Sequence, residues 1–421
     1  MTNDKILLLN IRIGSISGLL DPLSIKEWSS YEPLYSSVKG FLFILCLVRI
    51  LTPLIKDLSG GLVEIDAKKI IIAVGFSLIT MLIISALIYP SMIRSMGMRY
   101  GLASLDPFSQ PTNFYNKRLF MPVLAHVLFF RGKILFMGLS YIVLGALLTL
   151  LWIWWRSHTS LHFWQFLSLC TSSFVVMQYQ GYAGYPDILV FVFIMLLILA
   201  DWSQESRFSL LILCILTHES SAVPATVLAI FFLQKRFFLA YLAALGLYAF
   251  IWLMFYGFDP YAVLSSHNVY GKSGPLWVFH YPLREISGIA VSFKLLWIFI
   301  LWASAIAWMK RIYRPLLLIG GCVSAAVFMT FLGVDTSRLC GYAFPALLFS
   351  LSLLEKNVLI QNSSKKILVN LVFFFNLLIP SYYIGLNSEA INKPGGVYSD
   401  IYLLMGKSLE PLFSLLSAVF G

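Results

Sequence analysis

The chain is short of charged residues. Only 12% of its 421 residues are Asp, Glu, Lys or Arg, whereas 59% are apolar or aromatic. Soluble domains carry about 25% charged residues, so roughly half of the usual solvating groups are missing. With a mean hydropathy of +0.85, this composition excludes a soluble globular enzyme, a disordered chain and a secreted disulfide scaffold. We therefore expect a polytopic membrane protein.

Recognised cofactor and catalytic motifs are also missing. The five cysteines are scattered without CxxC spacing, and the sequence contains no HExxH, DxD or GxSxG motif and no phosphate-binding glycine loop. These absences argue against a metal centre, a nucleotide-driven mechanism and nicotinamide chemistry. We expect no required cofactor and no nucleotide partner, and leave a divalent cation open. The net charge of +11 comes without a basic tail or face, so nucleic acid is not an expected partner either.

Long charge-free runs predict the transmembrane helices, because a charge at a helix centre opposes membrane insertion. At about 20 residues per span, the apolar content predicts an all-α bundle of about 10–12 spans. The clearest charge-free runs are 70–93, 134–155, 157–186, 220–234, 237–258, 315–334, 339–354 and 367–388. The run 157–186 is long enough for one span and a loop.

Three segments are expected along the chain. Residues 1–69 form an N-terminal segment that is interfacial or contains one weak span, because the apolar stretch 38–55 includes Arg49. Residues 70–400 form the transmembrane domain, and residues 401–421 form an amphipathic or membrane helix. Residues 1–37 lack the compact apolar core of a cleavable signal peptide, so insertion is expected to use internal spans.

The distribution of positive charge predicts the topology. Alternate junctions carry bare Lys and Arg, which the positive-inside rule assigns to the cytoplasm. They are Lys68–Lys69, Arg156, Arg207, Lys235–Arg236, Lys310–Arg311 with Arg314, and Lys365–Lys366. The other junctions hold mixed acids, bases, histidines, Pro and Gly. The loop 91–132 is expected outside although it carries five cations, which we interpret as functional.

The predicted outer face carries most of the polar residues that could perform chemistry. They are Asp106, Tyr115, Arg118, Asp187, His218, Glu219, Lys272, Arg284, Asp335 and Arg338. Structural explanations stay open for several: Asp106 precedes a proline and could initiate a turn, Asp187 could complement a helix dipole, and Asp335 with Arg338 could form a local ion pair. His218 and Glu219 interrupt an apolar stretch, which is typical of an intramembrane polar site.

Carboxylates and cations at one membrane surface suit transfer of a group from a lipid phosphate. The cations would bind the leaving phosphate, and one carboxylate would deprotonate an acceptor hydroxyl. We expect these side chains to converge on one outward-facing cavity, because unpaired polar groups would destabilise the helices that carry them.

The order of these features resembles the GT-C superfamily of polytopic glycosyltransferases. The resemblance covers roughly residues 70–355. It rests on an outer loop with Asp106 and YNKRLFMPVLAHVLF, a span ending in WWRS, a YPD helix start, a THESSAVP break and a late DTSRLCGYAFP segment. It implies juxtamembrane helices in the first outer loop and an inverting transfer of a sugar from a polyprenyl-phosphate donor to a cell-envelope glycan or lipid. It also implies a bacterial inner (cytoplasmic) membrane location, with the active site facing the periplasm or exterior.

The resemblance assigns the first-loop catalytic acid to Asp106, which stands alone where many relatives carry an acid pair. Asp106 is then the expected general base, Glu219 the second choice, and His218 the residue that orients Glu219. Arg118 and Arg338 would stabilise the phosphate, with Lys272 and Arg284 as further cations. Tyr115, Asp187 and Asp335 are the remaining expected substrate-binding residues. Two alternatives stay open: a membrane polysaccharide polymerase, and a non-enzymatic transporter or flippase of lipid-linked sugars.

Overall fold

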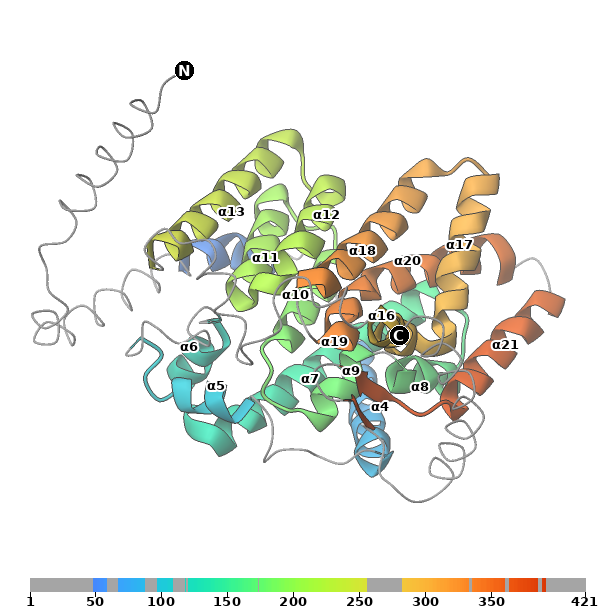
Figure 1. The fold of residues 1–421 in the computed structure, drawn as a ribbon, viewed down its shortest axis with the longest axis horizontal. Helices are drawn as coiled ribbons and strands as arrows, with labels where there is room; N and C mark the ends of the chain where they lie inside the picture. Colours follow the sequence, from blue (N-terminus) through green and yellow to red (C-terminus); the bar gives the residue numbers. More distant parts are fainter. Residues whose placement is uncertain are drawn as a thin grey trace, which may run out of the picture.

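The computed structural model is a bundle of helices (Figure 1). It describes residues 48–58, 67–87, 97–108, 118, 120–172, 174–255, 282–332, 335–359, 363–384 and 388–390. The predicted C-terminal segment 401–421, the N-terminal residues 1–47, Tyr115 and Lys272 lie outside these residues. Helix covers residues 48–58, where Leu54 and Asp57 are buried. Whether 38–55 crosses the membrane therefore stays a prediction.

Helices make up nearly all of the described chain. In the first half they are α4 Ala67–Leu87, α5 Gly97–Ala103, α6 Phe120–Val127, α7 Gly132–His158, α8 Phe163–Ser172, α9 Phe174–Gly181, α10 Asp187–Leu199, α11 Gln204–Thr217, η2 Glu219–Ser221, α12 Ala222–Phe232 and α13 Lys235–Phe255. In the second half they are α16 Pro282–Phe293, η3 Lys294–Leu296, α17 Trp297–Met309, α18 Tyr313–Leu332, α19 Thr336–Cys340, η4 Gly341–Ala343, α20 Phe344–Leu354, η5 Glu355–Leu359 and α21 Ser363–Leu378.

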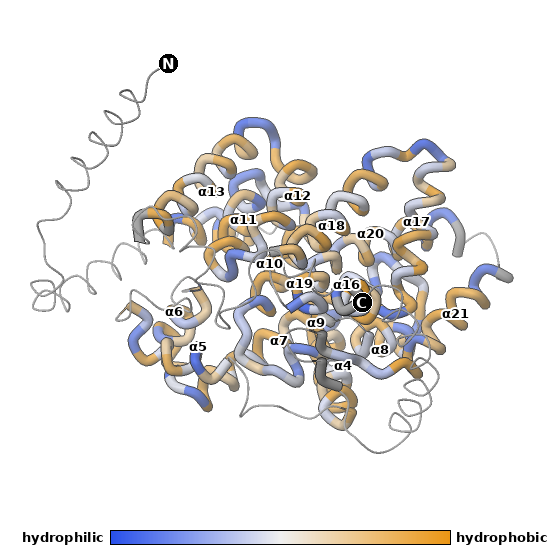
Figure 2. The backbone as a smooth tube through the Cα atoms, in the orientation of Figure 1, coloured by the Kyte–Doolittle hydropathy of each residue, from blue (hydrophilic) through white to orange (hydrophobic). Residues whose placement is uncertain are grey.

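Five helical segments are long and apolar enough to cross a membrane. They are Lys68–Leu87, Gly132–His158, Glu285–Met309, Tyr313–Phe331 and Thr336–Asn357. Figure 2 shows long hydrophobic stretches along these segments, and Ile71 and Leu82 of α4 are 72% and 71% exposed. A helix satisfies its own backbone groups, which a lipid environment requires. These features are those of a helical membrane protein, while the full count of 10–12 spans stays a prediction.

Two charge-free runs are organised differently from a single span. The run 157–186 contains two short helices, α8 and α9. The run 367–388 continues past α21 into a two-stranded antiparallel hairpin, β1 Tyr382–Ile384 and β2 Ser388–Ala390, in which Tyr382 pairs with Ala390. Pro380 follows the end of α21 and cannot continue a helix, because its ring removes the backbone donor. The all-α prediction did not include this hairpin.

Helices α11 and α12 form a hairpin that is too short to cross a membrane. The Arg207 guanidinium, near the start of α11, donates to the carbonyl of Phe232 at the end of α12 (3.3 Å), so both helices return to the same end. Arg314, at the start of α18, donates to the neighbouring carbonyl of Phe231 (3.3 Å). From this shared end, α12 with 11 residues extends about 17 Å, and the 20-residue α18 packed beside it about 30 Å. The hairpin turn at 218–221 therefore lies about 10 Å short of the far end of the bundle.

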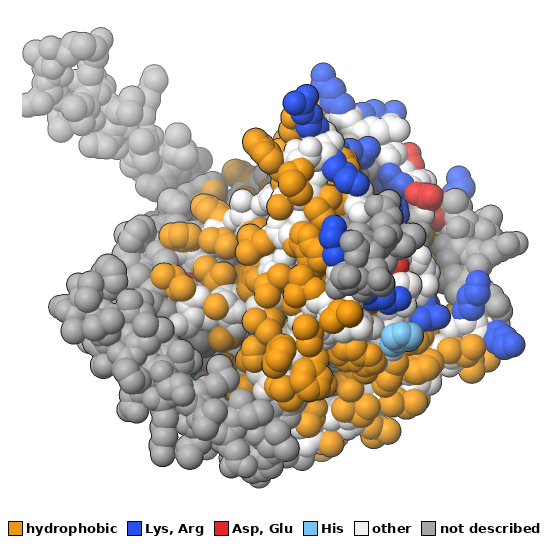
Figure 3. All heavy atoms as spheres, turned by 90° about the vertical axis from the view of Figure 1, so that its right-hand side faces the viewer, with side chains coloured by type: hydrophobic (Ala, Val, Ile, Leu, Met, Phe, Trp, Pro, Cys, Tyr) orange, Lys and Arg blue, Asp and Glu red, His pale blue; other side chains and the backbone are white. Residues whose placement is uncertain are grey.

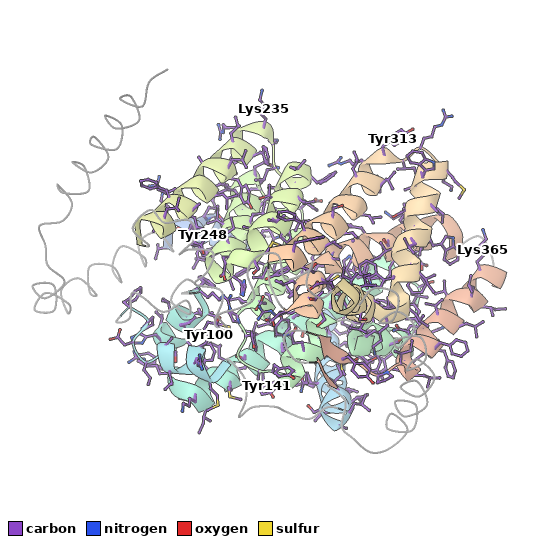
Figure 4. All side chains as sticks on the ribbon, in the orientation of Figure 1. Tyr100, Tyr141, Lys235, Tyr248, Tyr313 and Lys365 are labelled. Atoms are coloured by element: carbon purple, nitrogen blue, oxygen red, sulfur yellow. The ribbon has the colours of Figure 1, made fainter. Side chains whose placement is uncertain are left out.

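Cation-bearing turns gather at the end where this hairpin begins. Lys310 of the α17–α18 turn donates to the side-chain carbonyl of Asn357 (2.8 Å), which follows α20. Figure 4 places Lys235 and Tyr313 at the upper end of the molecule, and Tyr100 and Tyr141 at the lower end. In Figure 3, Lys and Arg side chains gather beside a broad apolar face. Arg207, Lys235, Lys310 and Arg314, from three of the turns predicted to be cytoplasmic, thus lie at one end, while their orientation in a membrane stays a prediction.

Helix α10 lies at the centre of the bundle. It packs against α7 and α11, and its residues from Asp187 to Met195 are all buried. A helix that is apolar on every side requires neighbours all round. Its first residue is therefore held deep inside the bundle, at the level of the α11–α12 turn.

Candidate functional site

Ionisable side chains from four separate segments meet at the end of α10. Arg118 precedes α6, Asp187 begins α10, His218 and Glu219 form the tip of the α11–α12 hairpin, and Arg338 lies in α19. We call the residues Arg118, Asp187, His218, Glu219, Asp335 and Arg338 the buried ionic cluster.

Arg118 and Glu219 form the closest ion pair of the cluster. The guanidinium donates from Nη2 to Glu219 Oε1 at 2.7 Å and from Nε to Oε2 at 3.0 Å, while Nη1 donates to the hydroxyl of Tyr100. The Arg118 side chain is 6% exposed and that of Glu219 16%. Parallel bonds of this type are stronger and more directional than a single contact. The pair therefore fixes the hairpin tip against the segment before α6.

The electrostatics of Arg118 follow from this pairing. Burial lowers the pKa of the guanidinium, but the charge and hydrogen bonds of Glu219 together with Tyr100 outweigh burial and raise the pKa above its ordinary value. The charge of Arg338 acts in the lowering direction, which shows that the two arginines influence each other. For Tyr100 burial acts in the opposite direction: it raises the pKa of the hydroxyl, which therefore stays protonated. Arg118 is thus a permanent cation in a buried position.

His218 lies close to two of the three acids of the cluster, Asp187 and Glu219. Its Nδ1 accepts a hydrogen bond from the backbone N–H of Ser220 (3.1 Å), so the proton of the neutral ring is on Nε2, 3.4 Å from Asp187 Oδ1. Glu219 Oε2 lies 3.7 Å from Nδ1. Burial, reinforced by the charge of Arg118, lowers the pKa of His218 to about 4, against the opposing effect of the two acids. The imidazole is therefore neutral at pH 7.

Asp187 is fully buried and receives a second donor. The hydroxyl of Tyr342 donates to Asp187 Oδ1 at 2.8 Å, and Tyr342 itself stacks on Phe191. Asp187 Oδ2 has no hydrogen-bond partner among the described residues. Asp187 therefore fixes the imidazole from one side, and Tyr342 fixes Asp187.

Arg338 and Asp335 form the other edge of the cluster. Arg338 Nη2 lies 3.1 Å from Asp335 Oδ2, and the guanidinium lies over the ring of Tyr185, 5.2 Å from its centroid. Beside them, Thr336 donates to the buried Glu285 of α16 at 2.7 Å. The ion pair that the spacing of Asp335 and Arg338 allowed is therefore present, and it lies within the cluster rather than apart from it.

A close contact between two glycines brings α5 to the cluster. Gly184 has φ of +96°, and a Cβ on Gly97 would lie 2.8 Å from the Gly184 Cα. No other residue allows this approach. It places Tyr100 of α5 against Arg118 and positions Tyr185 and Asp187, which follow Gly184 directly, on the opposite side.

The remaining expected residues are placed differently. Asp106 is exposed beyond α5, where its Oδ1 accepts from the backbone N–H of Phe108 (3.3 Å), so it occupies the turn that its sequence context also predicted. Tyr115 and Lys272 lie outside the described residues, and of Arg284 only the backbone, within α16, is described. Among the described residues, no group of three or more His, Cys, Asp or Glu could hold a metal ion.

Three tyrosines that contact the buried ionic cluster were not predicted. Tyr100, Tyr185 and Tyr342 contact Arg118, Arg338 and Asp187 respectively. Tyr185 and Tyr342 stand inside the YPD and DTSRLCGYAFP segments that the sequence analysis quoted. Their spacing from the charged residues was a usable signal, since Tyr342 follows Arg338 by one helical turn. Tyr100 had no comparable signal.

No family model, curated protein or solved structure matches the chain.

Proposed function

We propose that the chain is a membrane glycosyltransferase that moves a sugar from a polyprenyl phosphate to a cell-envelope glycan or lipid, with inversion at the anomeric carbon. The observation that carries the proposal is the buried ionic cluster. In a chain with 12% charged residues, two arginines, three acids and a histidine from distant segments meet below the end of the bundle. Buried ionisable groups are costly and are typical of functional sites.

The chemistry assigns roles to the cluster. Arg118 and Arg338 would bind the phosphate, for which guanidinium groups offer paired donors. Their positive charge would stabilise the negative charge that develops on the leaving phosphate. The short helices α5 and α6 between α4 and α7 support the resemblance to GT-C enzymes, which implied helices in this loop.

Two acids are candidates for the general base that deprotonates the acceptor hydroxyl. Asp106 is the first choice from the resemblance and Glu219 the second. The geometry favours Glu219, because this carboxylate contacts Arg118 and His218, whereas Asp106 is exposed on a turn. A base must lie within hydrogen-bond reach of the proton that it removes, next to the phosphate-binding groups.

Two linked measurements test the proposal. Mass spectrometry of lipid co-purified with the wild-type protein should identify a prenyl phosphate, and the corresponding donor should support sugar transfer in detergent. Glu219→Gln should lower transfer by about 10²–10⁴-fold, the usual cost of losing a general base, while Asp106→Asn should retain most of it. Loss in Asp106→Asn alone would return the base to Asp106. Full transfer activity in both variants would contradict the assignment of the base to either acid, and absence of transfer by the wild type would contradict the transferase proposal.

A lipid-linked sugar transporter is the second candidate. Its support is the number of interrupted helices, since 3₁₀ turns η2, η3 and η4 separate α11 from α12, α16 from α17 and α19 from α20. Transporters place binding sites at broken helices near the bilayer midplane. Movement of a labelled prenyl-phosphate sugar across proteoliposomes, without transfer to an acceptor, would favour this candidate.

A further inference from the structure

The buried ionic cluster has no spare positive charge among the described residues. Its two guanidinium groups face three carboxyl groups, and each arginine is already paired, Arg118 with Glu219 and Arg338 with Asp335. His218 is neutral at pH 7 and adds none. An anionic lipid head group that binds the Nε and Nη2 edge of Arg118 must therefore replace Glu219 as the partner of that edge.

Replacement of a carboxylate by a phosphate has a chemical consequence at Arg118, because it releases Glu219. Glu219 occupies the Nε and Nη2 edge of the guanidinium, which is the edge that binds a phosphate through two parallel hydrogen bonds. Glu219 and a phosphate oxygen pair therefore compete for the same donors. Asp335, by contrast, is paired to Arg338 from within the same helical turn.

We propose, building on the function proposed above, that the donor phosphate displaces Glu219 from Arg118 and thereby frees Glu219 to act as the general base. In the unliganded protein, the ion pair stabilises the ionised carboxylate and makes it a poor proton acceptor. Once the phosphate replaces it, Glu219 lies in a partly buried position without this cation, where taking up a proton becomes more favourable. Donor binding and base activation are thus one event.

The charges balance through the transfer step. The acceptor O–H bond breaks, and its proton goes to Glu219. The acceptor oxygen forms the new bond to the anomeric carbon, while the bond from that carbon to the phosphate oxygen breaks and leaves its electron pair on the phosphate. One negative charge therefore moves from Glu219 to a phosphate that Arg118 already binds. The acceptor cannot be deprotonated before the donor is present, which protects the donor site from premature proton transfer.

The chemical reactivity of Glu219 tests this without an activity assay. A hydrophobic carbodiimide modifies carboxyl groups that lack a cationic partner, and the labelled peptide is quantified by mass spectrometry. Farnesyl phosphate, a prenyl phosphate without a sugar, is the probe. We expect it to raise labelling of Glu219 about tenfold, the effect of losing one charge-assisted hydrogen bond. Labelling of the buried Glu355, at the other end of the bundle, is the internal reference and corrects for reagent consumed by the phosphate.

Variants of Arg118 provide the control. In Arg118→Gln, Glu219 should be labelled strongly without farnesyl phosphate and should not respond to it. If that variant does not fold, Arg118→Lys, which keeps the charge but loses the paired geometry, should give intermediate basal labelling.

The outcomes separate the two proposals. Binding of farnesyl phosphate is followed independently, as a rise in the unfolding temperature. Binding with unchanged or reduced Glu219 labelling would mean that the phosphate displaces the Tyr100 hydroxyl or binds elsewhere, and would overturn this inference alone. If farnesyl phosphate does not bind at all, the phosphate-dependent function fails, and the inference fails with it.

Discussion

At the scale of single residues, His218 is the best-defined group of the buried ionic cluster. The groups that face it are Asp187 and Glu219, which favour its protonation, and Arg118 and Arg338, which oppose it. Burial adds to the opposing effect, and the hydrogen bond from Ser220 N–H occupies Nδ1. The neutral ring therefore lies close to two acids without adding a charge.

This environment predicts an acid-sensitive stability. The pKa of His218 falls from 6.5 to about 4 on folding, so the unfolded state binds the proton first as pH falls. The stability contributed by the neutral ring is complete above pH 6.5 and is lost between pH 6.5 and 4. The loss should reach about 2 kcal/mol by pH 5.

Thermal unfolding in detergent measures this effect. His218→Asn keeps an acceptor at the position of Nδ1 and cannot be protonated. Its unfolding temperature should change less between pH 7 and pH 5 than that of the wild type. Equal acid sensitivity in both proteins would show that His218 does not titrate in this range.

At the scale of elements, the contact between α5 and the turn before α10 controls the shape of the cluster. Gly97 and Gly184 meet backbone to backbone, and the same two segments carry Tyr100 and Tyr185 to the two arginines. The approach depends on the absence of two Cβ atoms. A single methyl group is therefore enough to separate the segments.

Gly97→Ala should destabilise this contact. The new Cβ would lie 2.8 Å from the Gly184 Cα and closer still to the Ala183 carbonyl, and backbone atoms cannot move aside as a side chain can. We expect a loss of about 1–3 kcal/mol, the usual cost of overpacking, together with weaker binding of a prenyl phosphate. Gly138→Ala in α7 is the matched control: nothing lies within 4 Å of its new Cβ, so stability should hold or rise slightly. Equal unfolding temperatures for the two variants would contradict the contact.

At the scale of the whole molecule, the bundle has two chemically different ends. Arg207, Lys310 and Arg314 lie at the end where the α11–α12 hairpin begins, and they donate to the terminal carbonyls or side chains of neighbouring helices. The buried ionic cluster lies toward the other end. Combined with the positive-inside rule, this arrangement predicts that the cluster opens away from the cytoplasm.

Cysteine labelling in intact cells tests this orientation. In a cysteine-free background, a cysteine at position 310 should be protected from a membrane-impermeant maleimide, and one at position 275 should react. The reverse pattern would invert the topology and remove the cluster from the outer face, where a polyprenyl-phosphate donor is expected.

The sequence alone was sufficient for the features that depend on composition and on local order. The scarcity of charge predicts a helical membrane protein, since insertion is governed by the apolar content of each run. Local patterns also predicted the break at 217–221, and they offered the Asp335–Arg338 pair and the turn at Asp106 as structural alternatives to functional roles.

Only the tertiary structure decided which polar groups meet. Arg118 and Glu219 are 101 residues apart, and Tyr342 and Asp187 are 155 apart. Their contacts depend on how short helices pack around α10 and on a glycine contact between α5 and the turn at 184, and neither has a local sequence signal. Charge and hydropathy fix where a helix can run, because the membrane acts on each segment separately. The partner of a buried charge is fixed by packing, because that free energy belongs to several segments at once.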